Sequence, residues 1–261
     1  MTRPSAPVSR NPAEVSLKAE TQAVRLTRSR ARAGMSKLFA EVLARDRAEI
    51  TRHINKLAPT QLNWRTDREG TTSLLVACWQ GDAEVAEMLL VAGADPNQTN
   101  KRGVAPLMMA CHKGHLHCGL VCLHHGADVE LAVDRKITPL YAAAAAGHHE
   151  LVHACIVSGA LVDQLTSFGS TPLITAACRG YAACVAVLMH ANADLSIRHQ
   201  GRTALEWALQ LQQIEVVRVL AMEDPASFFD ENGQCSPPPA VQRIQSDRVL
   251  ASDDGGPDVA L

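Results

Sequence analysis

Small apolar residues and polar residues follow one another along the middle of this chain in a pattern that recurs about every 33 residues. Each unit opens with a short apolar segment, such as 74–78 or 140–144, and a glycine follows soon after. In the next segment apolar residues recur every three or four positions, as at Val85, Met88 and Leu89. This spacing is that of one face of a helix. Each unit is therefore predicted to contain two short helices followed by an extended turn.

Turn residues mark the same period independently. The spacings between aligned turn positions are 33, 33, 33 and 32 residues, at Gly70, Gly103, Lys136, Gly169 and Gly201. Shortly after each comes Thr-Pro-Leu or a variant of it, in which threonine caps a helix and proline is already fixed at helical φ. The inner glycines are expected to end the first helix in the left-handed conformation, at Gly81, Gly114, Gly147 and Gly180. Self-similarity at a fixed period predicts a stacked array rather than one globular core.

The unit resembles the ankyrin repeat. The resemblance rests on Thr-Pro-Leu, Gly-His (114–115 and 147–148) and Gly-Ala-Asp (93–95 and 126–128) at their mutual offsets, and it covers residues 67–224. It implies an all-α ankyrin-repeat solenoid of helix-turn-helix-hairpin units. The expected repeats are 67–99, 100–132, 133–165, 166–197 and 198–229. A degenerate capping unit is expected at 36–66, because 36–44 and 48–54 read as two short amphipathic helices.

Some units depart from this pattern. Lys136 stands where the hairpin turn favours glycine, so a positive φ there costs on the order of 1 kcal/mol, and the third hairpin is expected to be remodelled. Asn192 replaces a glycine but tolerates the same conformation. The fifth unit has Gln212 and Asp224 at its inner glycine positions and stops at Pro225. Terminal units face water, so an atypical last unit is expected.

The two ends of the chain carry opposite charge. Residues 1–34 hold seven Lys/Arg and two Asp/Glu, whereas residues 230–261 hold two and six. Both 1–35 and 230–261 are predicted to be disordered, because they bury little apolar area. The basic segment Arg25–Arg32 leaves two interpretations open, a targeting signal or a plain solvated tail. The last residues, Val259-Ala260-Leu261, resemble a PDZ ligand, which adds a strand to a sheet edge.

Composition restricts the functional classes. No stretch approaches the roughly 20 apolar residues of a membrane span, and the N-terminus lacks the apolar core of a secretory signal. The eight cysteines lie mostly in apolar helical contexts, so reduced thiols in the cytoplasm or nucleus are expected. The chain has no GxSxG, phosphate loop or paired-carboxylate motif. It is therefore predicted not to be an enzyme and to need no cofactor.

Residues 111–125 are rich in cysteine and histidine, which are the side chains that zinc prefers. However, Cys111, Cys118 and Cys122 fall at positions where the repeat needs small core residues, and cysteine packs well in such places. Core packing is the preferred interpretation, and no metal is expected. A zinc-dependent module is the alternative, which metal analysis of the purified protein would decide.

The resemblance implies a partner-binding concave surface formed by hairpin tips and by the exposed ends of the first helices. The candidate residues are Trp79, Arg102, His112, Lys113, Arg135, Phe168, Arg179 and Arg202. Arginine and aromatic residues dominate binding hot spots. The alternative is that Trp79 packs under a neighbouring hairpin and the basic residues only solvate the surface. The expected function is a monomeric, non-enzymatic adaptor or scaffold that binds another protein with an acidic or mixed apolar–acidic surface.

A second function remains as an alternative, in which the same basic surface and the N-terminal tail bind nucleic acid or another anionic surface. Such binding would weaken steeply as salt rises. The small number of aromatic residues and the net negative charge of residues 35–229 argue against nucleic acid.

Overall fold

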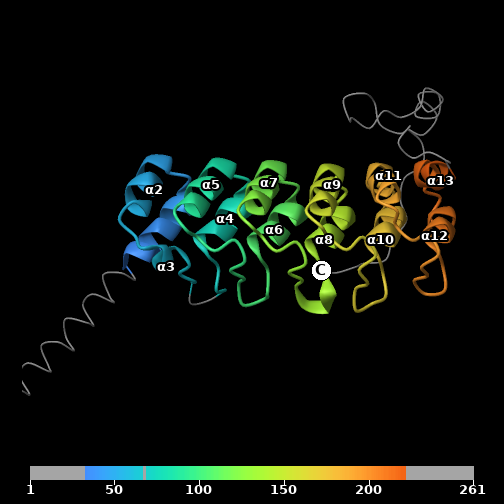
Figure 1. Cartoon of the computed structure of the whole chain (residues 1–261), viewed down its shortest axis with the longest axis horizontal. Coiled ribbons are helices and arrows are strands. Elements are labelled where there is room, and N and C mark those ends of the chain that lie inside the picture. The colour runs from blue at the N-terminus through green and yellow to red at the C-terminus, as the bar shows by residue number, and fades with distance from the viewer. Residues whose placement is uncertain (1–32, 67–68, 222–261) are drawn as a thin grey trace, which may run out of the picture.

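The computed structural model describes residues 33–66 and 69–221. Most of both predicted tails lies outside the described residues, and so do the basic segment Arg25–Arg32 and the C-terminal Val259-Ala260-Leu261. The described residues form an all-helical solenoid (Figure 1), which confirms the predicted fold class. None of the described helices is long and apolar enough to cross a membrane.

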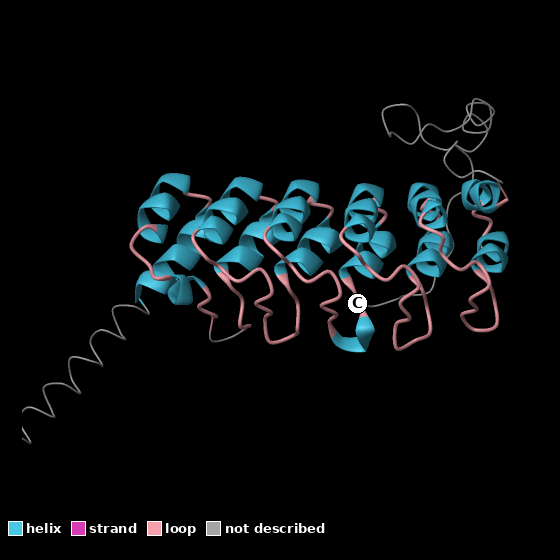
Figure 2. Cartoon of the chain, viewed as in Figure 1, coloured by secondary structure: helices cyan, strands magenta, loops and turns pink. Residues whose placement is uncertain are grey.

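The helices stand in two rows with the hairpins on one side (Figures 1 and 2). The N-terminal unit contains a helix over 33–44, then α2 (Arg47–Ile54) and α3 (Pro59–Leu62). The first helices of the repeats are α4 (Ser73–Gln80), α6 (Pro106–Lys113), α8 (Pro139–Ala146), α10 (Pro172–Arg179) and α12 (Ala204–Gln210). The second helices are α5 (Ala83–Val91), α7 (Leu116–His124), α9 (His149–Val157), α11 (Ala182–His190) and α13 (Ile214–Leu220).

The predicted capping residues begin and end the first helices. In each capped helix a threonine side chain accepts a hydrogen bond from the backbone N–H three residues on, and this holds for Thr72, Thr138, Thr171 and Thr203. Ala105 replaces threonine before α6, which has no side-chain cap. Left-handed glycines then end α4, α6, α8 and α10, as expected, at Gly81, Gly114, Gly147 and Gly180.

One hydrophobic core runs the length of the array, from Leu38 to Val219. Small side chains let successive first helices pack closely, and in α8 the run Ala142–Ala145 is buried. Each helix contacts its counterpart in the next repeat as well as its partner in the same repeat. The core is therefore made between repeats as much as within them.

A side chain from each repeat covers the helix-ending glycine of the repeat before it. The residue that precedes each second helix does this, with His115 over Gly81, His148 over Gly114, Tyr181 over Gly147 and Gln213 over Gly180. A Cβ on any of these glycines would collide with the covering side chain. These glycines thus serve twice, since they permit a positive φ and leave room for the next repeat.

The loops after the second helices are also joined from repeat to repeat. A side-chain oxygen in one loop accepts a hydrogen bond from the backbone N–H of the next, so successive loops are fixed in register. The pairs are Asn63 with Asp95 (2.8 Å), Asn97 with Asp128 (2.7 Å), Glu130 with Leu161 (2.8 Å) and Asp163 with Asp194 (3.1 Å).

Among the described hairpins, the third is the one with a 3-10 helix at its tip, whereas the fifth shares with it two successive positive-φ residues (Gln200 and Gly201) and an isolated bridge (His199 to Arg202). Both Arg135 and Lys136 have positive φ, 67° and 58°, and the short 3-10 helix η1 (Asp134–Lys136) forms the tip. Val133 and Ile137 close it as an isolated bridge. Each left-handed side-chain residue costs on the order of 1 kcal/mol relative to glycine.

Other positions of the backbone are also informative. Asn192 and Gln212 adopt positive φ where earlier repeats have glycine, at 59° and 54°.

In the N-terminal unit helical structure is already present at residue 33, before the expected boundary at 36. The helix α3 in the same unit has no counterpart among the helices expected from the sequence.

Replacing Gly114 by alanine tests the double role of the helix-ending glycines. The change strains a left-handed residue and also displaces the ring of His148, whereas Gly126→Ala strains a residue with φ of 80° and open space around it. We expect Gly126→Ala to lower the free energy of unfolding by about 1 kcal/mol and Gly114→Ala to lower it by more. Denaturant unfolding followed by circular dichroism measures both. Equal losses would show that the contact between repeats contributes nothing.

Candidate functional site

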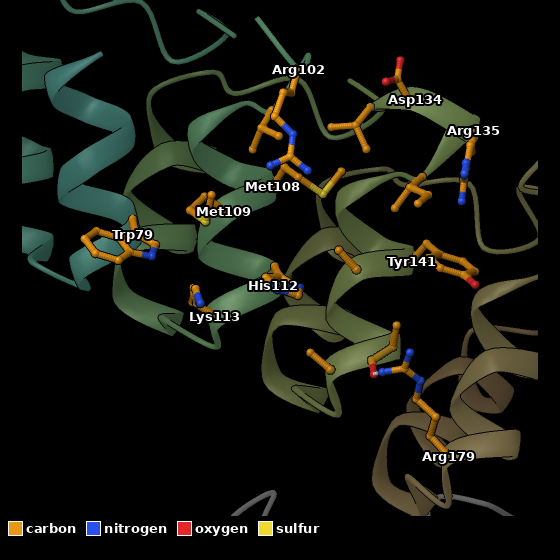
Figure 3. A pocket seen from close by; sticks show the side chains of 16 residues that line it. Trp79, Arg102, Met108, Met109, His112, Lys113, Asp134, Arg135, Tyr141 and Arg179 are labelled. Carbon is orange, nitrogen blue, oxygen red and sulfur yellow. Dashed lines mark hydrogen bonds between the residues drawn. The ribbon is translucent and has the colours of Figure 1, made fainter. Parts of the chain in front are cut away.

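A hollow of about 720 Å³ lies on the side of the first helices and hairpins, across the repeats that contain α4, α6, α8 and α10 (Figure 3). We call it the concave hollow. Six of the residues predicted from the sequence line it, and all six are exposed: Trp79, Arg102, His112, Lys113, Arg135 and Arg179. They come from positions spread over about a hundred residues of sequence. The stacking of the repeats brings them to one surface.

The cationic side chains of the hollow fall into two groups. Arg102 and Arg135 lie on hairpins, whereas Lys113 and Arg179 lie at the C-terminal ends of α6 and α10 (Figure 3). One acid, Asp134, also lines the hollow. Four permanent cations against one carboxylate make this surface attractive to negative charge.

Apolar side chains form the floor between the two groups of cations. They are Val104, Met108, Met109, Val133, Ile137, Tyr141, Ala142, Ala145 and Ala146. Trp79 lies at one end of this floor with 48% of its surface exposed, so it is not packed under a neighbouring hairpin. An exposed tryptophan and methionines beside cations suit a partner that offers both apolar groups and acids.

Several of these side chains are held in place by neighbouring repeats. Arg179 Nη1 donates a hydrogen bond to the carbonyl oxygen of Ala145 at 2.8 Å. The hydroxyl of Tyr141 accepts one from Thr175 at 2.9 Å. The Arg135 guanidinium lies over the ring of Phe168, 4.9 Å from its centre. Such contacts limit the rotamers that a binding event would have to freeze.

The hollow leaves out two of the predicted residues. Phe168 has 56% of its surface exposed and touches the site only through Arg135. Arg202 lies one repeat further on, where its guanidinium is 5.0 Å from the ring centre of Trp207. Met109 and Tyr141 of the floor were not predicted, because half-buried apolar residues on a first helix are expected to belong to the core.

The comparison with protein families agrees with this geometry. A family model described as ankyrin repeats in three copies matches residues 74–163 and again 140–231. The chain belongs to the ankyrin repeat family. A search of curated proteins finds no match. Ankyrin repeats are generally protein–protein interaction modules and are typically non-enzymatic.

In this ankyrin array the cysteines and histidines of 111–125 point to different places. Cys111 Sγ is 3.7 Å from Cys155 Sγ, and Cys122 Sγ is 3.5 Å from Cys78 Sγ, all within the core. His115 instead donates to the carbonyl oxygen of Trp79 at 3.2 Å. The cysteines are thus placed between repeats as small core residues.

The pKa shifts of two core thiols, Cys78 and Cys111, agree with a packing role, whereas contact with Cys78 lowers the pKa of Cys118. Thiol contacts with Cys118 and Cys122, followed by burial, raise the pKa of Cys78. Thiol contact with Cys155 and burial raise the pKa of Cys111. A thiol with a raised pKa stays protonated at neutral pH, whereas zinc binds the thiolate.

The N-terminal unit holds a charged cluster that the sequence did not reveal. Glu41 is buried, and its Oε2 lies 2.9 Å from His53 Nδ1, while Lys37 Nζ is 3.7 Å from Oε1. Glu49 is the third member and forms an ion pair with Arg52. Ligand atoms of Glu41, Glu49 and His53 lie close enough to hold a cation. Because Lys37 and Arg52 lie beside the two carboxylates, we interpret the cluster as a network of ion pairs within the cap.

A second hollow, of about 830 Å³, lies on the opposite row, along α7, α9 and α11. Its lining is mostly aliphatic, with Leu120 and Val157 exposed, and its basic side chains are His149, His153 and His190. It therefore lacks the permanent cations of the concave hollow, and it is a weaker candidate for binding an acidic partner.

His112 is a side chain of the concave hollow whose charge depends on pH. Partial burial, followed by the cations Lys113 and Arg179, lowers the pKa of His112. Burial and then His112 lower the pKa of His148 in the next repeat. Both imidazoles are therefore neutral at pH 7 in the folded chain. Their contribution to stability is fully present above the unfolded pKa and is lost as pH falls through that value toward the lower folded pKa.

The variant His112→Gln/His148→Gln tests this linkage, and glutamine already occupies the position equivalent to His148 at Gln213. We expect the free energy of unfolding of the variant to fall less than that of the wild type between about pH 7 and about pH 5. His117→Gln, outside the hollow, is the control and should follow the wild type. The same loss of stability in the double variant and the wild type would contradict the assignment.

Proposed function

We propose that this protein is a monomeric, non-enzymatic adaptor or scaffold that binds a segment of another protein in the concave hollow. The segment would carry acidic and apolar side chains. The observation that carries the proposal is the convergence of Trp79, Arg102, His112, Lys113, Arg135 and Arg179 on one hollow with an apolar floor. No single repeat contains this set, so the site is a property of the array.

The two parts of the hollow have different physical tasks. The floor around Trp79, Met109 and Tyr141 would supply affinity, because apolar and aromatic anchors carry most of the binding energy in protein interfaces. The cations at its edges would act mainly on the rate of association and on the choice of partner. An acidic segment would thus be drawn to the hollow before its apolar side chains dock.

Two of the cations are available for a partner. Within residues 33–66 and 69–221, no carboxylate forms an ion pair with Arg102 or Lys113. Arg179 and Arg135 are instead held by Ala145 and Phe168, as described above. A partner carboxylate could therefore form an ion pair with Arg102 or Lys113 without first breaking an existing ion pair.

Reversing these two charges is the direct test. The partner is first isolated by affinity capture with the wild-type chain, and its association with purified variants is then measured by surface plasmon resonance at several salt concentrations. We expect Arg102→Glu/Lys113→Glu to reduce the association rate by roughly tenfold or more at low salt and to flatten its salt dependence. A Trp79→Ala variant should mainly raise the dissociation rate.

Lys56→Glu is the matched control, because Lys56 is exposed and lies outside the hollow. An unchanged association rate in the double variant would rule out the concave hollow as the binding surface. If the captured partner is a nucleic acid, log affinity should instead fall linearly and steeply with log salt, and the alternative function would replace the proposed one.

A further inference from the structure

The last repeat ends in an apolar face that every earlier repeat keeps buried. Leu205 and Leu209 of α12 are 39% and 57% exposed, whereas the equivalent Leu173 and Ala177 of α10 are 1% and 0% exposed. The same two positions are buried in α4, α6 and α8, where they are Leu74, Cys78, Leu107, Cys111, Leu140 and Ala144. In those repeats the following repeat covers them.

A terminal repeat usually presents a polar outer face to water. Here Leu211 and Ile214 of the same repeat are exposed as well, at 41% and 49%, so the last repeat exposes several large apolar side chains. A surface of this kind marks a contact with another element or another molecule.

The chain itself supplies a suitable element directly after α13. Residues 222–231 include Met222, Phe228 and Phe229. The two phenylalanines are half of the four in the sequence. The ankyrin family match extends to residue 231, ten residues past the last described residue, Ala221. The residues that match the ankyrin family thus include 222–231.

The geometry brings this segment within reach. α12 and α13 pack against each other as an antiparallel pair, so the end of α13 lies beside Leu205 at the start of α12. Packed helix axes are about 8–10 Å apart, and Leu209 lies one helical turn beyond Leu205. Seven residues join Ala221 to Phe228, and such a segment spans at most about 25 Å. The distance to either leucine is well below this limit.

We propose that residues 222–231 form a C-terminal cap in which Phe228 and Phe229 cover Leu205 and Leu209. The cap takes the place of a following repeat and closes the hydrophobic core. Its occupant is this chain's own segment rather than a second copy docked end to end. The proposal does not depend on the function assigned to the concave hollow.

Methyl NMR on the full-length chain tests the cap, because a phenylalanine ring shifts the resonances of methyl groups beneath it. In Phe228→Ser/Phe229→Ser the methyl resonances of Leu205 and Leu209 should move, and the melting temperature should fall. Those of Leu161, which is exposed at a distance from this end, should stay unchanged. The matched control is Val249→Ser/Leu250→Ser, which removes two apolar side chains beyond residue 231 and should leave Leu205 and Leu209 as in the wild type.

A reciprocal variant tests the other side of the contact. Leu209→Glu alters an exposed residue and should increase amide hydrogen exchange in 226–231. Unmoved Leu205 and Leu209 resonances in the phenylalanine variant would overturn the proposal. So would a contact that is lost on dilution together with a dimer in sedimentation velocity, because the occupant would then be a second copy.

Discussion

Contact between successive repeats is the interaction on which the rest of this structure depends. The core of each repeat is completed by its neighbours, and the alanines of α8 are buried because α6 and α10 lie on either side of them. Two further contacts repeat at the same interval, a side chain over the preceding glycine and a hydrogen bond between successive loops. Each fixes a repeat relative to its neighbour, and together they fix the direction in which the array grows. The surface side chains are then free to vary, because none of these contacts uses the hairpin tips.

The elements of the fold were predictable where the signal is local. Threonine before a helix and glycine after it act on the backbone of their own turn, and the structure places Thr138 and Gly147 as the sequence predicts. The third hairpin was less predictable. Lys136 indicated a strained turn, but the positive φ of Arg135 depends on the bridge between Val133 and Ile137 and on the hydrogen bond from Ser167 in the next hairpin. The extra helix α3 and the buried Glu41 belong to a degenerate unit, in which the repeat pattern no longer predicts the helices or the buried positions.

The candidate site was predictable in part, for a reason that follows from the repeat. The resemblance to ankyrin repeats implies which positions of a unit face the concave side, and the period locates those positions in this chain, so Arg102, Lys113 and Arg179 could be named from the sequence. It does not tell how far along the array a hollow extends, and this is why Phe168 and Arg202 fall outside it. Met109 and Tyr141 of the floor were not predicted, because each is half-buried, between the core and the surface. Only the packed structure shows that one side of each remains open, and that Tyr141 is fixed by Thr175 of the next repeat.

The place of the hollow within the array has a physical consequence of its own. In an array held by nearest-neighbour contacts, an inner repeat is supported from both sides and an end repeat from one. The hollow is centred on α6 and α8, which are inner helices, whereas Leu205 and Leu209 lie at the end. Fraying that starts at the last repeat must therefore disrupt the contact between α10 and α12 before it reaches Arg179, the last cation of the hollow. Arg179 is in turn tied to Ala145 across the next interface, so the site loses its geometry only after two interfaces have opened. The proposed binding surface thus occupies the part of the array where nearest-neighbour packing makes preorganised side chains least costly to maintain.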